Sequence, residues 1–375
     1  MLNHFINNQN IMKKTQLILA AALVAFAACT KENVNLAVNE FDNEIGFNAV
    51  NRKAVRSNDA IISGTTYATD NTFKVWGWQS EAADFSEFAD DDASNFMSNL
   101  TISYCGGPQS RANAWRNAEH YYYWPFTGAI SFLAIHPSTI APSSTGWDAT
   151  NDKPQAAIND YTIVPATNET VDLMFATNEG TRNSVLAGDG KVALVFKHAL
   201  AQIEVQVKTD ADYTADVAFD IDSVVFHKID LSGDVTYSND AIAWADNTTQ
   251  TEDWVYYNTS LEDIVVTPQV YGAAKLNIPQ PANFDASALD PGHAKYNAED
   301  AVKATITIGY SMEQTGSDKI SGTVTIADPF LSNVDNAWEA GKKYNYTINF
   351  RLNEILFNPS VTDWVDVNVT TINIY

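Results

Sequence analysis

A strict alternation of apolar and polar side chains near residue 350 constrains the fold of this chain more than any other feature. Over residues 343–352 the apolar side chains are Tyr344, Tyr346, Ile348, Phe350 and Leu352, and every intervening residue is polar or charged. Successive side chains of a β-strand point to opposite faces, whereas one face of a helix repeats every 3.6 residues. The segment is therefore predicted to be a strand with one face in the core and the other in solvent.

Similar short segments recur along the chain and predict an all-β protein. Strands are expected at residues 44–49, 73–78, 130–135, 172–176, 192–196, 203–207 and 365–375. Residues 81–97 and 111–119 fit short helices or structured loops. Many short strands bounded by turn residues are typical of β-sandwiches. The parity of the apolar positions changes between Val369 and Ile372, which indicates a bulge or two short strands there.

The first 29 residues have the order of a bacterial lipoprotein signal. Lys13 and Lys14 precede an uncharged, almost wholly apolar run at residues 17–28, and Ala27 and Ala28 precede Cys29. A basic start, an apolar run and small residues before a cleavage site indicate a secretory signal. The run is shorter than the roughly 20 residues of a membrane-spanning helix. We therefore expect removal of residues 1–28 and acylation of Cys29; the alternative is an ordinary signal with a chance cysteine.

Length and charge limit the remaining architecture. The chain of 375 residues is long enough for about two domains. A turn signal at residues 187–190 indicates a boundary between two domains. The predicted domains are residues 57–189 and residues 190–375. With two cysteines, one of them Cys29, the chain has no disulfide framework. The net charge of −24 argues against a nucleic-acid partner.

No catalytic or metal-binding motif stands out in the sequence. It has no G-x-S-x-G, H-E-x-x-H or phosphate-binding glycine loop. His198 is interpreted as a structural side chain at a strand bend, the Asp90-Asp91-Asp92 run as a solvated loop, and Cys105 as an inert thiol. We therefore predict a protein that is not an enzyme and that carries no metal and no cofactor.

Two further segments each allow two interpretations. The aromatic run Tyr121-Tyr122-Tyr123-Trp124-Pro125 fits a strand entering the core, with Pro125 ending its pairing, and less well a sugar-binding surface. Residues 51–59 concentrate Arg52, Lys53 and Arg56 in an otherwise acidic chain. That segment is either a solvated loop or an exposed site for a trypsin-like protease.

Five stretches follow one another along nearly the whole chain. They are the signal ending at Cys29, residues 44–49 with the basic loop behind them, residues 123–125 with 132–137, residues 172–176 with 194–203, and residues 338–344. Each stretch alone is a weak signal, but together and in this order they resemble the fimbrillin family of Bacteroidales, the subunits of type V pili and their relatives.

The resemblance implies two tandem transthyretin-like β-sandwich domains and export to the outer membrane as a lipoprotein. It also implies that an arginine-specific protease cuts behind the first strand, here at Arg56 or Arg52. Residues 29–56, with the apolar side chains Ile45, Phe47 and Ala49, would then be the tether and removable strand. A terminal strand of another subunit would fill the groove that is left. Its apolar residues here would be Val365, Val367, Val369, Ile372 and Ile374.

The sequence therefore predicts a structural subunit of surface fimbriae that assembles with other copies by strand exchange and supports adhesion. The alternative is a permanently lipid-anchored surface protein or fimbrial tip adhesin that binds glycans or host ligands through surface aromatic residues. The two differ in the mature N-terminus, which would be Ser57 in a processed subunit and acylated Cys29 in an anchored protein.

Overall fold

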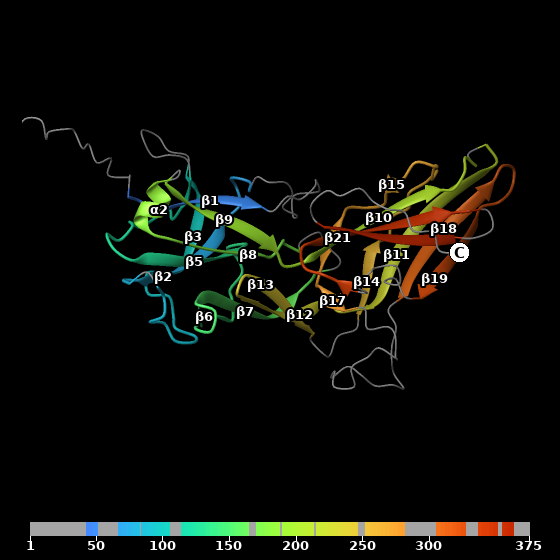
Figure 1. Ribbon diagram of the computed structural model, residues 1–375. Helices are drawn as coiled ribbons and strands as arrows, with labels where there is room; N and C mark the ends of the chain where they lie inside the picture. The colour runs from blue at the N-terminus through green and yellow to red at the C-terminus, as the bar shows by residue number, and fades with distance from the viewer. Residues whose placement is uncertain are drawn as a thin grey trace, which may run out of the picture.

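The computed structural model describes residues 43–51, 67–82, 84–105, 114–164, 170–187, 190–213, 215–246, 252–281, 305–327, 337–351 and 355–363. The regular secondary structure of this part is almost entirely β-strand, and the strands form an elongated molecule with two halves (Figure 1). The one helix in these ranges is the five-residue α2, Arg182–Leu186. The all-β prediction is confirmed.

The N-terminal half contains a closed barrel. Its strands, in order around the barrel, are β1 (Gly46–Asn51), β4 (Ala114–Arg116), β3 (Met97–Cys105), β2 (Phe73–Ser80), β5 (Ala129–His136), β8 (Met174–Gly180) and β9 (Lys191–His198). Side chains of these strands form one buried apolar cluster inside the barrel. Because the last strand, β9, pairs with β1, the described barrel has no open sheet edge.

A second sheet covers the outer face of β2 and β5. It consists of β13 (Ala241–Asp246), β12 (Ser232–Ser238), β7 (Lys153–Thr162) and β6 (Ser144–Asp148). Val75 and Phe132 point into the barrel, whereas Trp76 and Leu133 belong to the cluster under the second sheet. Both faces of β5 are therefore buried, and all eight of its residues are buried. This explains why most of its residues are apolar rather than alternating with polar ones.

The C-terminal half is a β-sandwich (Figure 1). One sheet contains β15 (Gln269–Val270), β10 (Ala201–Thr209), β21 (Lys342–Phe350) and β22 (Ile355–Asp363), with β16 (Lys275–Asn277) also paired to β10. The other contains β14 (Glu252–Tyr257), β11 (Val217–Ile229), β18 (Thr305–Gln314) and β19 (Ile320–Ala327). A short pair, β17 (Gln280–Pro281) with β20 (Ala337–Trp338), completes the described strands. Tyr346 and Phe226 meet between the sheets, with ring centroids 5.6 Å apart.

The strand with the clearest sequence pattern behaves as predicted. Tyr344, Tyr346, Ile348 and Phe350 are at most 2% exposed, and the residues between them in β21 are half-buried. Most other predicted strands are also present. The interpretation of residues 111–119 as a short helix or loop was incomplete, because Ala114–Arg116 form β4. A strand of three residues is too short for the alternation of apolar and polar side chains to be recognised in the sequence.

Strand pairing does not follow the predicted boundary between residues 189 and 190. β9 lies beyond that position, yet it pairs with β8 and β1 of the barrel. The hairpin of β12 and β13 comes later still, and it pairs with β7. Hydrogen bonding thus assigns residues 191–198 and 232–246 to sheets of the N-terminal half. The transthyretin-like character of the two domains stays a prediction.

Candidate functional site

The most informative site is the strand β1 and the groove that it fills. β1 lies parallel to β9, in a register that places Phe47 beside Val192 and Ala49 beside Leu194. On its other side it runs antiparallel to β4, with Phe47 beside Trp115. β1 therefore closes the barrel by pairing with strands that lie far from it in the sequence.

The three apolar residues predicted for this strand all point into the barrel. Ile45, Phe47 and Ala49 are 3%, 1% and 3% exposed. The Phe47 ring makes an edge contact with Phe132, with centroids 5.3 Å apart, and another with Phe73 at 6.2 Å. Burial of a large apolar side chain is worth about 1.5–3 kcal/mol. β1 is thus a full part of the barrel core.

The chain just before β1 is held by the aromatic run. The Ile45 N–H donates to the Tyr122 carbonyl at 2.7 Å, and the Trp124 N–H donates to the Asn43 carbonyl at 2.9 Å. Trp124 is buried, with its ring 6.0 Å from that of Phe132. The interpretation of this run as strand-like chain entering the core is supported. Tyr121 and Tyr123 keep 55% and 44% of their surface exposed.

A buried ion pair joins the start of β1 to β4. Nε of Arg116 lies 3.5 Å from Oε2 of Glu44, and the two side chains are 7% and 1% exposed. The guanidinium also lies against Gly46, because an ideal Cβ there would be 3.3 Å from both Nε and Nη2 of Arg116. Arg116 therefore lies against Glu44, just before β1, and against Gly46, the first residue of β1.

Tyr67 packs into the apolar core of the barrel. It is fully buried, stacks on Phe196 with centroids 5.1 Å apart, and lies 5.6 Å from the Trp115 ring. Its hydroxyl is 2.6 Å from Nδ1 of His136. Burial lowers the pKa of His136 to about 4, against a smaller opposing effect of the Asp172 carboxylate. The histidine is therefore neutral at neutral pH, and Tyr67 anchors the chain at the start of the next described range.

The other residues considered for chemistry have structural roles. Nδ1 of His198 forms a 2.7 Å hydrogen bond with Oδ2 of Asp172, and both side chains are buried. The Asp90 carboxylate accepts from the Ala149 N–H, and the Asp92 carboxylate accepts from the Ala89 N–H. Within the described ranges, no cluster of three or more His, Cys, Asp or Glu side chains is arranged to hold a metal ion.

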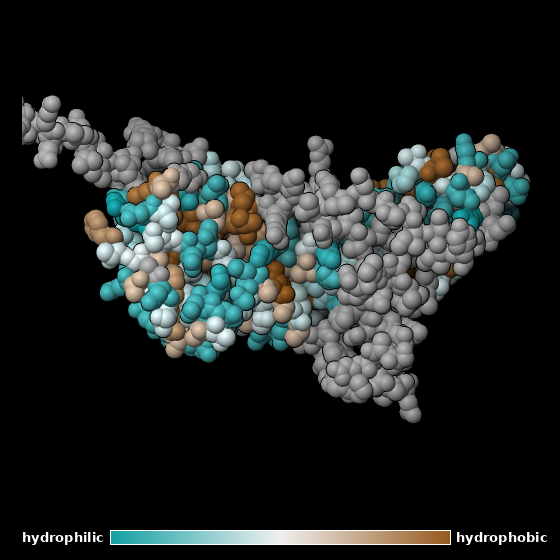
Figure 2. Space-filling model, viewed as in Figure 1, coloured by the Kyte–Doolittle hydropathy of each residue, from teal (hydrophilic) through white to brown (hydrophobic). Residues whose placement is uncertain are grey.

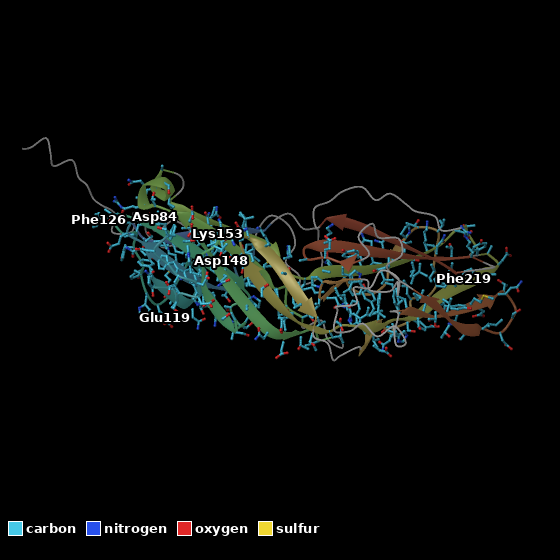
Figure 3. All side chains as sticks on the ribbon, turned by 60° about the horizontal axis from the view of Figure 1, so that its bottom comes forward. Asp84, Glu119, Phe126, Asp148, Lys153 and Phe219 are labelled. Atoms are coloured by element: carbon cyan, nitrogen blue, oxygen red, sulfur yellow. The ribbon has the colours of Figure 1, made fainter. Side chains whose placement is uncertain are left out.

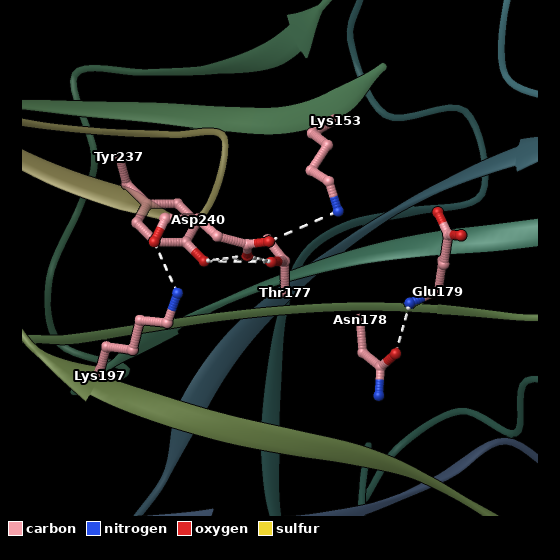
Figure 4. Close-up of polar contacts among 7 residues, drawn as sticks. All are labelled: Lys153, Thr177, Asn178, Glu179, Lys197, Tyr237 and Asp240. Atoms are coloured by element: carbon pink, nitrogen blue, oxygen red, sulfur yellow. Dashed lines mark hydrogen bonds and ion pairs between the residues drawn. The ribbon is translucent and has the colours of Figure 1, made fainter. Parts of the chain in front are cut away.

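A polar network fastens the β12–β13 hairpin to the barrel (Figure 4). Asp240, in the hairpin turn, accepts hydrogen bonds from the hydroxyls of Thr177 and Tyr237. Nζ of Lys153 lies 3.5 Å from Oδ2 of Asp240, and Nζ of Lys197 donates to the Asp240 carbonyl at 2.6 Å. The carboxylate is about 40% exposed, so its contacts serve to position the hairpin.

Several predicted site residues lie outside the described residues. They are Cys29, Arg52, Arg56, Val365, Val367, Val369, Ile372 and Ile374. Their roles stay predictions. Among the described residues, no helix is both long and apolar enough to span a membrane.

Sequence reasoning missed Arg116 and Tyr67. Arg116 lies in a three-residue strand, and the distance from Glu44 in the chain hides their pairing. Tyr67 stands alone after the basic loop, with no neighbouring pattern that marks it as buried. Its position shortly before the predicted strand 73–78 was the one available signal.

Comparison with known proteins identifies the family of this architecture. A fimbrillin-like family model matches residues 60–364. The chain belongs to the fimbrillin-like family. The match begins after β1 and the basic loop, so it rests on the barrel, the covering sheet and the sandwich. No functionally curated protein matches this fimbrillin-like chain.

One solved structure agrees with the fold, and a second is similar at a lower level. A fimbrial protein from Bacteroides vulgatus ATCC 8482 matches with a TM-score of 0.58 and 16% identity, covering 86% of this chain and 100% of that one. A candidate cell adhesion protein from Bacteroides uniformis ATCC 8492 has a TM-score of 0.49 and 18% identity, covering 86% and 99%. At these identities the first match supports the fold of this fimbrillin-like protein and nothing finer.

Proposed function

We propose that this protein is a structural subunit of a cell-surface fimbria and that β1 is exchanged for a strand of another copy after proteolysis. The observation that carries the proposal is the place of β1. It closes the barrel between β4 and β9, and it is followed directly by the basic segment with Arg52 and Arg56. A cut in that segment leaves β1 held by non-covalent contacts alone.

The physics of an opened barrel favours assembly. Loss of β1 would expose unpaired backbone groups of β4 and β9 and the apolar cavity that Phe47 fills. An incoming strand restores both by β-augmentation. A joint between a groove on one copy and a strand of the next is head-to-tail and does not close, so it produces filaments.

The surface gives no sign of a rival apolar joint on the face that Figure 2 shows. Hydrophilic residues cover most of the visible N-terminal half, and apolar ones form separate small patches. Extended apolar patches are what normally mark protein interfaces. The large apolar surface of this half instead lies beneath β1, which supports a joint that forms after β1 leaves.

The assignments of residues follow from this scheme. Arg56 is the proposed cleavage residue, with Arg52 as the alternative. Cys29 carries a lipid that holds the precursor at the outer membrane until the cut, after which residues 29–56 leave. The donor is the segment 365–375 of another copy.

Treatment of the purified full chain with an arginine-specific protease tests the processing step. We expect trimming to Ser57 and ladders of oligomers in unboiled gels. Arg56→Lys should block the cut, because lysine keeps the charge but is not a substrate, and Arg52→Lys is the matched control. A wild-type chain that is cut to Ser57 yet stays monomeric would refute the polymerising role.

Deletion of residues 365–375 tests the donor. The variant should remain a folded monomer that is still cut and that caps filaments of the intact chain. Filaments formed by the deletion variant alone would assign the donor strand to another segment.

A second candidate function is ligand binding at the outer end of the barrel. Phe126 is 91% exposed there, below the Arg182 guanidinium at 5.6 Å from the ring, and Figure 3 shows it at the tip of the molecule. Tyr121 and Tyr123 add exposed aromatic surface. Glycan-array binding lost in Phe126→Ala and Tyr121→Ala, by a chain that is never cut, would favour an anchored or tip adhesin. Trp124 is unsuitable for this test because it belongs to the core.

A further inference from the structure

We propose that the groove left by β1 selects its incoming strand by charge, and that Asp366 of a second copy supplies the carboxylate that Arg116 loses with Glu44. The inference rests on the proposed strand exchange and specifies which strand the groove accepts and in which direction it enters.

Arg116 is built into the groove rather than into β1. It ends β4, which pairs with β3 through Ser103 and remains in the barrel when β1 departs. Its side chain is 7% exposed and reaches Glu44 at 3.5 Å across Gly46. Glu44 and Gly46 lie on one face of the extended chain, opposite Ile45 and Phe47. The groove thus recognises both faces of β1, one through apolar burial and one through charge.

Exchange changes the partner of this buried cation. Removal of β1 takes away the Glu44 carboxylate, and removing one member of a buried ion pair is strongly unfavourable. An incoming strand with apolar residues alone would fill the cavity of Phe47 but would not replace the Glu44 carboxylate. A strand with an acid one residue before the apolar residue that replaces Ile45 would repair both.

The predicted donor carries such an acid. Glu44-Ile45-Gly46-Phe47, which leads into β1, corresponds to Asp366-Val367-Asn368-Val369 near the C-terminus. Asp366 is the one acidic residue in 364–375. Val367 and Val369 then take the places of Ile45 and Phe47. The valines are smaller than the residues they replace, so the exchanged strand fills this part of the cavity less completely.

The pattern fits in one direction only. If the donor ran opposite to β1 with Asp366 at the place of Glu44, the next three places would be taken by Val365, Trp364 and Asp363, in that order. That order places the carboxylate of Asp363 in the apolar cavity of Phe47. The donor is therefore expected to run in the direction of β1, parallel to β9.

This direction defines where the two copies meet. β1 begins at the outer end of the barrel and points toward the middle of the molecule (Figure 1). A donor parallel to it enters at that outer end, where the exposed Phe126 lies (Figure 3). Phe126 and its neighbours Tyr121 and Tyr123 would then be covered at the joint.

One position requires adjustment. Asn368 falls at the place of Gly46, where an ideal Cβ would be 3.1 Å from the Ala114 Cβ and 3.3 Å from the Arg116 guanidinium. Asp366 is one methylene shorter than Glu44. A small movement of the flexible Arg116 guanidinium toward Asp366 would make room for the Asn368 side chain. The same movement would bring the guanidinium to the shorter carboxylate.

Peptide binding to the cut full-length protein tests the inference. The acceptor is the chain after arginine-specific cleavage, and binding of labelled peptides of residues 364–375 is followed by fluorescence anisotropy at fixed salt. Asp366→Asn should weaken binding about 30-fold or more, as expected for loss of one partner of a buried charge pair. The matched control, Asp366→Asn with Thr370→Asp, keeps the net charge, moves the carboxylate four residues along the chain and away from Arg116, and should bind as weakly.

A second acceptor isolates the contact. In Glu44→Gln with Arg116→Met, the uncut protein has no buried charge at this position, and its thermal melt checks that it folds. The wild-type and Asp366→Asn peptides should bind this acceptor within about twofold of each other, since the charge coupling is gone.

The outcomes separate this inference from the proposed exchange. If both peptides bind the wild-type acceptor equally well, exchange stands and charge selection is overturned. If only a peptide of residues 43–51 binds, the groove opens but Asp366 is not the donor group, which also overturns the inference. If no peptide binds, strand exchange itself fails.

Discussion

The two halves of the molecule treat their strand edges differently. In the barrel, β1 has a hydrogen-bonded neighbour on each side, so the described sheet has no edge. In the sandwich, β22 pairs with β21 alone and β19 with β18 alone among the described strands. Closed sheets resist edge-to-edge association, whereas open ones need short or polar edges. Under the proposed exchange, assembly through the barrel therefore begins with the removal of β1 by a protease.

The largest expected effect is that of Phe47→Ala. Truncation of a buried phenylalanine costs about 3–5 kcal/mol, so the free energy of unfolding should fall by that amount in the uncut chain. Phe226→Ala in the sandwich should cost as much, but only Phe47→Ala should speed the release of β1 after cleavage. Denaturant melts and mass spectrometry of the released segment measure the two effects. Asn48→Ala is the control on the outer face of β1, and equal release rates for the two phenylalanine variants would contradict the comparison.

The barrel should also lose stability at mildly acidic pH through His136. Its folded pKa of about 4 is below the ordinary value of 6.5, so the folded state favours the neutral ring. This contribution is complete above pH 6.5 and is lost as the pH falls toward 4, by up to about 3 kcal/mol. Denaturant melts of His136→Gln between pH 7 and 4 should show a shallower loss than wild type. The exposed His120→Gln is the control, and an unchanged slope in His136→Gln would show that another group is responsible.

A smaller effect is expected from Glu44→Gln. The amide keeps the shape of the side chain but leaves Arg116 beside a neutral partner, which should cost about 1–3 kcal/mol of stability. Glu119→Gln, on the outer surface of the barrel in Figure 3, is the matched control and should be neutral. Thermal melts at low and high salt should show that the Glu44 effect persists, because a buried pair is screened little.

The smallest effect concerns the hairpin network of Figure 4. The ion pair of Lys153 with Asp240 is more than a third exposed on both sides, so its contribution should be at most about 1 kcal/mol. A double-mutant cycle of Lys153→Met and Asp240→Asn measures the coupling between them. A coupling as large as that of the buried Glu44–Arg116 pair would mean that the hairpin, rather than the barrel, limits stability.

Much of the local structure was predictable from the sequence. The direction of each side chain along a strand is fixed by the backbone, so alternation alone identified the inward faces of β21 and β1. The burial of Ile45, Phe47 and Ala49 follows from that rule. The largely apolar sequence of β5 was also visible, although the sheet that covers its outer face was not.

Which strands become neighbours was decided by the tertiary structure. Nothing in the sequence near Glu44 indicates Arg116, and nothing near β1 indicates that β9 lies beside it in parallel. Such partners are far apart in the chain, and they are selected by how all the apolar faces pack at once. The sequence by itself determined a β-rich chain with an apolar first strand before a basic segment. Only the packing made that strand the closure of a barrel, with a buried arginine that recognises it.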